Sequence, residues 1–409
     1  MSKTIWYISK YCAIPDKKSK GSRGWHLMKE FVNKGYQSVI ITSDSNNSSN
    51  SHSFNLSTEY ILKEGVHIML LKTLKYSVAK SFVRILSWFH FEWNLFWLKK
   101  NFFSKPDVII VSSLSILTII NGYFLKKKYK CKLVFEIRDI WPLTLTEEGG
   151  FSRYNPAIIL LQFLEIWGYK KSDLIIGTMP NLSEHVKNVI GSTIRAVNCI
   201  PMGVDLEFIK NAQSISSDYI ERYLNPDYFN IVYAGTIGIT NALETFFKAA
   251  DELSKNSKIR FVVVGDGPLK KKFQKEFGHL PNLVFAPRVY ENQIQSVLLN
   301  TDVLYLSVFK SKVWNFGQSM NKVIDYMLSN KPIIASYTGY PSMINEANCG
   351  YFIPAENPQL LVKEIKRLYL MTESELNEIG KNGRDWLFKN RTYQKLADDY
   401  LKVLFDYKS

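Results

Sequence analysis

Short apolar runs recur along the chain, and longer stretches with apolar residues three or four positions apart separate them. The short runs predict buried strands, the longer stretches predict helices, and their alternation predicts βα units around a parallel sheet. In the first half we expect strands at 4–9, 37–42, 107–112, 132–137, 173–177 and 196–200. We expect helices there at 25–34, 114–128, 156–167 and 182–189.

A second βα series follows a polar interval at 211–227, which we interpret as a domain boundary. Its predicted strands are 230–233, 259–264, 283–285, 302–306 and 333–334. Its predicted helices are 242–253, 269–277, 294–299, 321–328, 359–371, 373–382 and 392–406, the last long enough to return to the first domain. The predicted fold class is α/β with two Rossmann-like domains, 1–208 plus 391–409 and 209–390, because a chain of 409 residues exceeds a single core.

One segment, 72–105, departs from this pattern because tryptophans and phenylalanines are mixed with basic residues along it. Arg84, His90 and Glu92 interrupt its apolar run, so we do not expect it to span a bilayer. Aromatic rings beside lysines are typical of a helix that lies in the interface of an anionic membrane. The alternative is a pair of core helices whose rings pack under a sheet.

The formal net charge is +15, from 52 basic and 37 acidic residues. This excess implies an anionic partner, which is nucleic acid, phospholipid or a phosphorylated substrate. No zinc-finger, RNA-recognition or helix-turn-helix pattern accompanies it, so nucleic acid is not expected. The 4 cysteines form no CxxC pair, which argues against a zinc site and favours a reducing cytoplasm. The N-terminus begins with a strand and shows no pattern of a secretion signal.

Polar side chains follow the strand at 132–137 in the first domain. Arg138 and Asp139 come directly after this strand, and Trp141-Pro142 stiffens the chain beyond them. Residues at the carboxyl ends of parallel strands face the ligand crevice, so these two side chains are candidates for chemistry. The alternative is a purely structural Arg–Asp pair.

A loop of small and basic residues precedes the helix at 25–34 and consists of Gly21, Ser22, Arg23 and Gly24. Small residues before a helix allow the backbone to approach a phosphate or a sugar closely. The segment 10–20, between the first strand and this loop, is too long for a dinucleotide fingerprint, and GxGxxG is absent, which excludes NAD binding of that type. The alternative is a plain surface turn with basic side chains.

Three strands of the second domain end in turns that suit a ligand. Because the strands are parallel, these turns should lie at one edge of one sheet. The candidate donor-binding residues in the turns are Gly235, Thr236 and Gly238, then Gly265 and Gly267, then Arg288.

The helix predicted at 321–328 adds a further candidate. Ser319 is the expected N-cap, and the backbone N–H groups of Met320 and the residues after it would face an anion. Asn321 and Asp325 share a face, with Lys322 beside them as a cation for a diphosphate and Asp325 as an acceptor for sugar hydroxyls. The alternative is an ordinary αβ unit whose aspartate faces water.

Taken together, these motifs resemble glycosyltransferase family 4, whose GT-B fold has two Rossmann-like domains facing a central cleft. The resemblance covers nearly the whole chain and is closest to a bacterial O-antigen and capsule subgroup that includes N-acetyl-L-fucosamine transferases. The stretches that carry it are 136–142, 201–205, 233–238, 263–268, 348–354 and 322–334, the last similar to the family pattern KLxEYMAxGKPVI.

Two departures from the family pattern concern the donor site. The family usually carries two glutamates eight positions apart, and here Gly317 stands at the first position and Asp325 at the second. The aspartate can still accept ribose hydroxyls, but Gly317 has no side chain for the usual contact to the donor sugar. The family often has Arg and Lys after its first glycine turn, whereas 237–243 has neither. The positive charge must therefore come from Lys322, Arg288, Lys310 or Lys312, and Lys322 is the choice because it opens the helix.

The resemblance implies a retaining glycosyltransferase that needs no metal and no cofactor. It would move a sugar from a nucleotide diphosphate, such as a UDP-sugar, to a lipid-diphosphate-linked oligosaccharide in O-antigen or capsule synthesis. Lys322 and Arg288 would stabilise the leaving diphosphate. Asp139 would lie near the acceptor hydroxyl or the sugar, and Arg138 would orient it or contact the acceptor phosphate.

The same reading places the protein in the cytoplasm, peripherally on the inner membrane. Two alternatives stay open: a nucleotide-sugar 2-epimerase of the same fold, and a non-catalytic membrane-associated scaffold. The sequence does not specify the donor sugar, the acceptor, the linkage or the oligomeric state.

Overall fold

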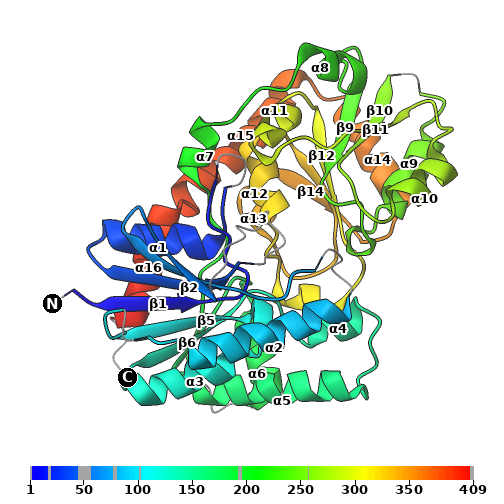
Figure 1. The fold of residues 1–409 in the computed structure, drawn as a ribbon. Helices are drawn as coiled ribbons and strands as arrows, with labels where there is room; N and C mark the ends of the chain where they lie inside the picture. The colour runs from blue at the N-terminus through cyan, green and yellow to red at the C-terminus, as the bar shows by residue number, and fades with distance from the viewer. Residues whose placement is uncertain are drawn as a thin grey trace. The chain divides into compact units, whose positions relative to one another are not determined.

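The computed structural model describes residues 2–16, 20–44, 57–76, 81–100, 103–191, 196–256 and 258–405. The chain divides into two compact units. Unit 1 contains Met1–Gly203 and Tyr393–Ser409, and unit 2 contains Val204–Thr392. Each unit is an α/β layer structure around its own sheet (Figure 1).

The sheet of unit 1 has the strand order β3-β4-β2-β1-β5-β6-β7-β8. All neighbours are parallel except β3, which pairs antiparallel with β4. The strands are β1 (Thr4–Ile8), β2 (Gln37–Ser43), β3 (Thr58–Lys63), β4 (Val66–Leu71), β5 (Val108–Ser112), β6 (Lys132–Ile137), β7 (Leu174–Gly177) and β8 (Val197–Cys199). The central strands are buried along their length because helices cover both faces of a parallel sheet.

The helices of unit 1 come from both ends of the chain. They are α1 (Arg23–Asn33), α2 (Phe82–Trp97), α3 (Thr118–Tyr129), α4 (Leu143–Glu147), α5 (Pro156–Lys171), α6 (Leu182–Ile190) and α16 (Tyr393–Phe405). The C-terminal helix α16 packs on α1, where Tyr393 stacks on His26 and the ring of Tyr400 meets that of Phe31. This confirms the prediction that the last helix returns to the first domain.

The sheet of unit 2 is entirely parallel, with the order β11-β10-β9-β12-β13-β14. Its strands are β9 (Phe229–Ala234), β10 (Ile259–Val264), β11 (Leu283–Ala286), β12 (Val303–Ser307), β13 (Ile333–Ser336) and β14 (Gly350–Ile353). Its helices are α7 (Leu206–Lys210), α8 (Ser217–Tyr223), α9 (Glu244–Glu252), α10 (Lys270–Phe277), α11 (Ile294–Leu299), α12 (Asn321–Leu328), α13 (Met343–Glu346), α14 (Pro358–Tyr369) and α15 (Glu373–Asn390). The order places β9, β10 and β12 at the centre of the sheet, which makes their carboxyl ends neighbours.

The structure differs from the sequence prediction in several elements, among them the short helices α4, α7, α8 and α13 and the strand β14, which were not predicted. The hairpin of β3 and β4 is not predicted, because β3 is a half-exposed edge strand without a continuous apolar run. Helix α15 extends to Asn390, well beyond the predicted end at 382. The described part of 72–105 contains one helix, α2, so the pair of core helices is wrong; residues 77–80, 101 and 102 lie outside the described residues.

Candidate functional site

The turns after β9 and β10 interlock at the carboxyl edge of the unit 2 sheet. Gly235 N–H donates to Val264 O over 3.0 Å, and Ile237 N–H donates to Asp266 O over 2.9 Å. A Cβ atom on Gly265 would lie 2.0 Å from Gly235 O, and one on Gly267 would lie 2.3 Å from Ile237 O. Glycine is therefore required at both positions because one backbone passes directly against the other.

Lys322 reaches these turns from the first turn of α12. Its Nζ donates to Tyr233 Oη over 2.9 Å and to Asn241 Oδ1 over 2.6 Å, and it lies 4.6 Å from the centroid of the Tyr233 ring. A Cβ atom on Gly235 would lie 3.3 Å from this nitrogen. The predicted residues Gly235, Gly265 and Lys322 are thus brought together in one unit.

The charge of Lys322 has no acidic partner. Its hydrogen bonds go to neutral oxygens, and no carboxylate of the described chain pairs with it. Burial alone lowers the pKa of Lys322 from 10.5 to about 8. An enclosed ammonium beside two backbone turns is stabilised by an anion, because the anion would replace the water that burial removes.

Two residues that the sequence did not single out hold Lys322 in place. Tyr233 Oη accepts from Lys322 and donates to Thr236 O over 2.7 Å, and Asn241 Nδ2 donates to the same carbonyl over 2.9 Å. Ser307 Oγ donates to Asn241 O over 2.6 Å, which ties the turn to β12. The sequence carried one signal: a polar residue, Asn241, stands where the family has basic ones.

Helix α12 is fixed to the sheet by Tyr326. Its hydroxyl donates to Ala234 O over 3.1 Å and accepts from Ala234 N–H over 2.8 Å, so the helix is anchored to the end of β9. The helix begins as predicted at Asn321, but the N-cap is Met320 and not Ser319, and no side chain caps the first turn. The polar cap is thus wrong, and the first-turn N–H groups lack a side-chain acceptor at the cap.

The polar residues of α12 lie as the spacing predicts. Asn321 is exposed and Asp325 is half-buried one turn further along. Just before the helix, Gly317 adopts φ 104 and Gln318 is buried, at 6% exposure. Neither polar atom of the Gln318 amide has a hydrogen-bond partner in the part of the chain that the structure describes. The sequence analysis missed this residue, which adjoins the position of the absent family glutamate.

Arg288 forms no hydrogen bond or ion pair with the described residues of the Lys322 cluster. It follows β11, the edge strand of the sheet, and its side chain is exposed with no hydrogen bond or ion pair to the described residues. Lys310 and Lys312 are also exposed. Of the four cations proposed for the diphosphate, Lys322 is thus the one that is enclosed.

In unit 1, Arg23 and Gly24 of the predicted loop 21–24 are packed inside the unit. Arg23 is buried, forms an ion pair with Glu136, and donates to Pro201 O over 3.2 Å and to Ile200 O over 2.7 Å. A Cβ atom on Gly24 would lie 2.4 Å from the Tyr7 ring. The guanidinium of Arg23 is engaged inside the unit, so the geometry does not support the predicted phosphate contact.

Glu136 is the centre of this buried cluster. Its carboxylate accepts from Arg23, from Tyr7 Oη over 2.9 Å and from Tyr400 Oη over 3.3 Å, and it is fully buried. Burial would lower the pKa of Arg23, but the adjacent Glu136 raises it above the ordinary value. The cluster joins β1, β6, α1 and α16 with a matched pair of charges.

Asp139 and Arg138 differ in how firmly they are held. Asp139 accepts from Trp141 Nε1 over 2.8 Å and from Thr144 Oγ1 over 2.7 Å, so each carboxylate oxygen has a donor. Arg138 donates its backbone N–H to Ser113 Oγ over 3.0 Å, while its half-buried guanidinium makes no hydrogen bond to the described residues. The structure therefore presents a fixed carboxylate next to a side-chain cation available to a ligand.

Comparison with known proteins relates this geometry to a family. Residues 228–371 match the family model described as "Glycosyl transferases group 1", which covers most of unit 2. The chain is 23% identical over 291 residues to sulfoquinovosyl transferase SQD2 of Arabidopsis thaliana, across 69% of this chain and 53% of that protein. The chain spans about half the length of this curated relative.

Solved structures match along almost the whole chain. Trehalose-6-phosphate synthase OtsA has a TM-score of 0.72 at 13% identity and full coverage of both chains. Sucrose-phosphate synthase from Thermosynechococcus elongatus has a TM-score of 0.69 at 13% identity, covering 98% of each chain. Anabaena HepE in complex with UDP-glucose has a TM-score of 0.63 at 10% identity, covering 99% of this chain and all of the other. The fold is that of the GT-B glycosyltransferases. The family model that matches is one of glycosyltransferases, and the match lies within unit 2.

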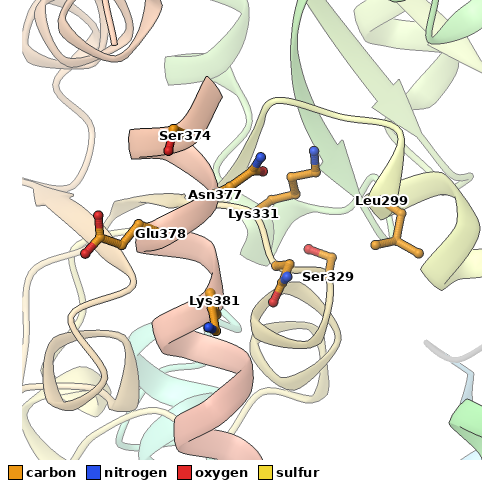
Figure 2. Close-up of a pocket in the computed structure, with 8 residues that line it drawn as sticks. Leu299, Ser329, Lys331, Ser374, Asn377, Glu378 and Lys381 are labelled. Atoms are coloured by element: carbon orange, nitrogen blue, oxygen red, sulfur yellow. The ribbon is translucent and has the colours of Figure 1, made fainter. Parts of the chain in front are cut away.

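A surface pocket in unit 2 of this GT-B fold lies away from the predicted donor residues. Figure 2 shows Ser329 and Lys331 among its lining residues, and these directly follow the C-terminal end of α12. Lys322 lies in the first turn, at the other end of the helix. Its lining is Leu299, Ser329, Asn330, Lys331, Ser374, Asn377, Glu378 and Lys381. Within the described residues, no three His, Cys, Asp or Glu side chains come together as a metal site would require.

Proposed function

We propose that this protein is a retaining glycosyltransferase that uses a UDP-sugar, of the UDP-N-acetyl-L-fucosamine type, as donor. The acceptor we propose is a lipid-diphosphate-linked oligosaccharide of O-antigen or capsule synthesis, met at the inner face of the membrane. The observation that carries the proposal is Lys322, an enclosed cation without a carboxylate partner beside two interlocked glycine turns. Related structures in complex with UDP and UDP-glucose support a UDP-sugar donor.

On this proposal the donor diphosphate lies against Lys322 and the backbone N–H groups around Gly238 and Met320–Lys322. These donors stabilise the charge that develops as the sugar–phosphate bond breaks, so neither a metal nor a cofactor is needed. Asp325 accepts the ribose hydroxyls, and Arg288 supplies a second positive charge at the same sheet edge. The amide of Gln318 is a further donor and acceptor for hydroxyls in this unit.

The acceptor side of the reaction is assigned to unit 1. Asp139 lies near the acceptor hydroxyl, where its negative charge favours loss of the hydroxyl proton, and Arg138 contacts the acceptor phosphate. We assign no covalent role to Asp139. Its two hydrogen bonds, from Trp141 and Thr144, fix the direction in which the carboxylate points.

The donor class is tested by thermal unfolding of the full chain with UDP, GDP, TDP, CMP and ADP at millimolar concentration. A nucleotide at about 100 times its Kd stabilises the folded state by about 2.7 kcal/mol, which shifts Tm by several degrees. We expect UDP to give the largest shift. If no nucleotide shifts Tm, the donor proposal fails and the non-catalytic scaffold becomes the better description.

The role of Asp139 is tested by Asp139→Asn. The amide keeps a similar shape but loses the negative charge, so we expect turnover to fall by about 100-fold or more while UDP affinity changes less than about twofold. Sugar transfer from labelled donor and UDP titration measure the two quantities. An equal loss of both would contradict the assignment, because Asp139 would then act on donor binding.

A further inference from the structure

Helix α2 carries an exposed apolar stripe along its whole length. Trp97 is 65% exposed, Trp93 is 64% exposed and Phe82 is 71% exposed. The full set recurs at helical spacing and consists of Phe82, Ile85, Leu86, Phe89, Trp93, Phe96 and Trp97. Residues spaced in this way lie on one face of a helix, so the stripe is a single continuous surface.

The opposite face of α2 packs inside unit 1. Phe91 and Leu95 are fully buried, and Glu92 accepts from Thr118 Oγ1 over 2.5 Å and from Asn121 Nδ2 over 2.7 Å on α3. Burial raises the pKa of Glu92 to about 7. An apolar helix face is normally covered in a folded protein, yet the outer face of α2 is exposed.

The stripe continues onto the neighbouring helix. The rings of Phe96 on α2 and Phe124 on α3 lie 6.4 Å apart, and Phe124 is 54% exposed. Helix α3 packs on α5, where Tyr123 and Trp167 are 5.0 Å apart. Helix α5 adds its own exposed apolar side chains, which are Ile159, Leu160 and Phe163.

Lysines gather where the stripe ends. The last turn of α3 holds Lys126, Lys127 and Lys128; Lys126 pairs with Asp173, whereas Lys127 and Lys128 are exposed. Helix α5 also ends in a basic last turn. No described helix is long and apolar enough to cross a membrane.

We propose that the outer faces of α2, α3 and α5 form a docking surface for an anionic lipid bilayer. Exposed tryptophans and phenylalanines enter the headgroup boundary, and the lysines at the ends of α3 and α5 contact lipid phosphates. The charges favour a bilayer over a second copy of this chain, because a second copy would bring its own lysines to the surface. The inference goes beyond the reaction proposed above and enlarges the predicted 72–105 segment with two helices that the sequence pattern did not assign to a membrane.

The test is co-sedimentation of the full chain with phosphatidylcholine vesicles, with and without phosphatidylglycerol. We expect binding to the anionic vesicles and little binding to the neutral ones. Trp93→Ser combined with Trp97→Ser should weaken binding by at least about tenfold, because both exposed rings leave the interface. The matched control is Leu370→Ser, which removes an apolar side chain that is 83% exposed in unit 2 and should leave binding unchanged.

A second arm tests the lysines. Lys127→Gln and Lys128→Gln together should reduce binding to anionic vesicles by several-fold, while Lys363→Gln on α14 should not. Light scattering reports whether the aromatic variant changes the oligomeric state. The proposal would be overturned if the wild type is a dimer that does not bind vesicles and the tryptophan variant is a monomer. The stripe would then mediate self-association. The UDP-induced Tm shift is measured in parallel, so a failure of vesicle binding is distinguishable from a failure of the donor proposal.

Discussion

The carboxyl edges of the two sheets are lined by different groups. In unit 2 the edge is backbone against backbone, since glycine turns cross one another and a lysine fills the space beside them. In unit 1 the corresponding edge, after β6, is lined by side chains. They are the buried Arg23–Glu136 pair and the hydrogen-bonded Asp139. A backbone site requires particular residue types at particular spacings, whereas a side-chain cluster can be assembled from distant positions.

The largest effect should come from breaking the buried pair in unit 1. Arg23→Met leaves Glu136 without a cation, and such a loss typically costs about 3–5 kcal/mol of unfolding free energy. Urea unfolding measures it. Arg367→Met breaks a surface pair with Glu364 and should cost less than about 1 kcal/mol. If both variants lose the same unfolding free energy, the central role of the buried pair is refuted. Adding Glu136→Gln to Arg23→Met should recover part of the lost unfolding free energy.

The next effect concerns the backbone contact in unit 2. Gly265→Ala places a methyl group against Gly235 O, so the two turns must separate, at about 3 kcal/mol of stability. Gly238→Ala is the control, because the nearest atom to its added Cβ would be 3.6 Å away. Its stability should stay within about 0.5 kcal/mol of the wild type. Thermal unfolding compares the two, and a tolerated Gly265→Ala would show that the turns are not closely interlocked.

Removing the cation should separate function from stability. Lys322→Met should weaken UDP binding by about 100-fold, because a charge-assisted contact is lost, without unfolding unit 2. Isothermal titration measures the affinity, and Lys363→Met provides a variant that removes an exposed lysine instead. If the UDP affinity of Lys322→Met equals that of the wild type, UDP does not bind at Lys322.

The smallest effect is a pH dependence. Burial holds the pKa of Lys322 at about 8, so UDP affinity should fall by about tenfold between pH 7 and pH 9 as the amine loses its proton. The Lys322→Met variant should show a flat profile in the same titration. The sign for stability is opposite: without ligand, the unfolded chain keeps this proton up to about pH 10.5, so the wild type gains stability relative to the variant as pH rises above about 8.

Much of the fold could be predicted from the sequence, since buried parallel strands are continuous apolar runs. Strands such as β6 and β10 and helices such as α11 and α12 agree with the predicted bounds. The edge hairpin of β3 and β4 was missed because a half-exposed strand has no such run. The family likeness identified the fold through several short motifs, none of which was sufficient alone.

The sites were less predictable than the fold. The grouping of Lys322 with the glycine turns follows from parallel strand order, which brings carboxyl ends together. The contact of Lys322 with Tyr233 and the burial of Gln318 could not be found, because both depend on side-chain packing in three dimensions. The same limit explains Arg23: its basic, small-residue surroundings suggested exposure, while Glu136, far away in sequence, binds it in the interior.

The interlocked turns of unit 2 also bear on how this protein can diversify. Gly265 and Gly267 each lie against another stretch of backbone, so almost any substitution there must displace a second loop as well. A change at either position therefore alters two loops at once. We therefore expect sequence variation in this unit at the side chains around the turns rather than in the turns themselves.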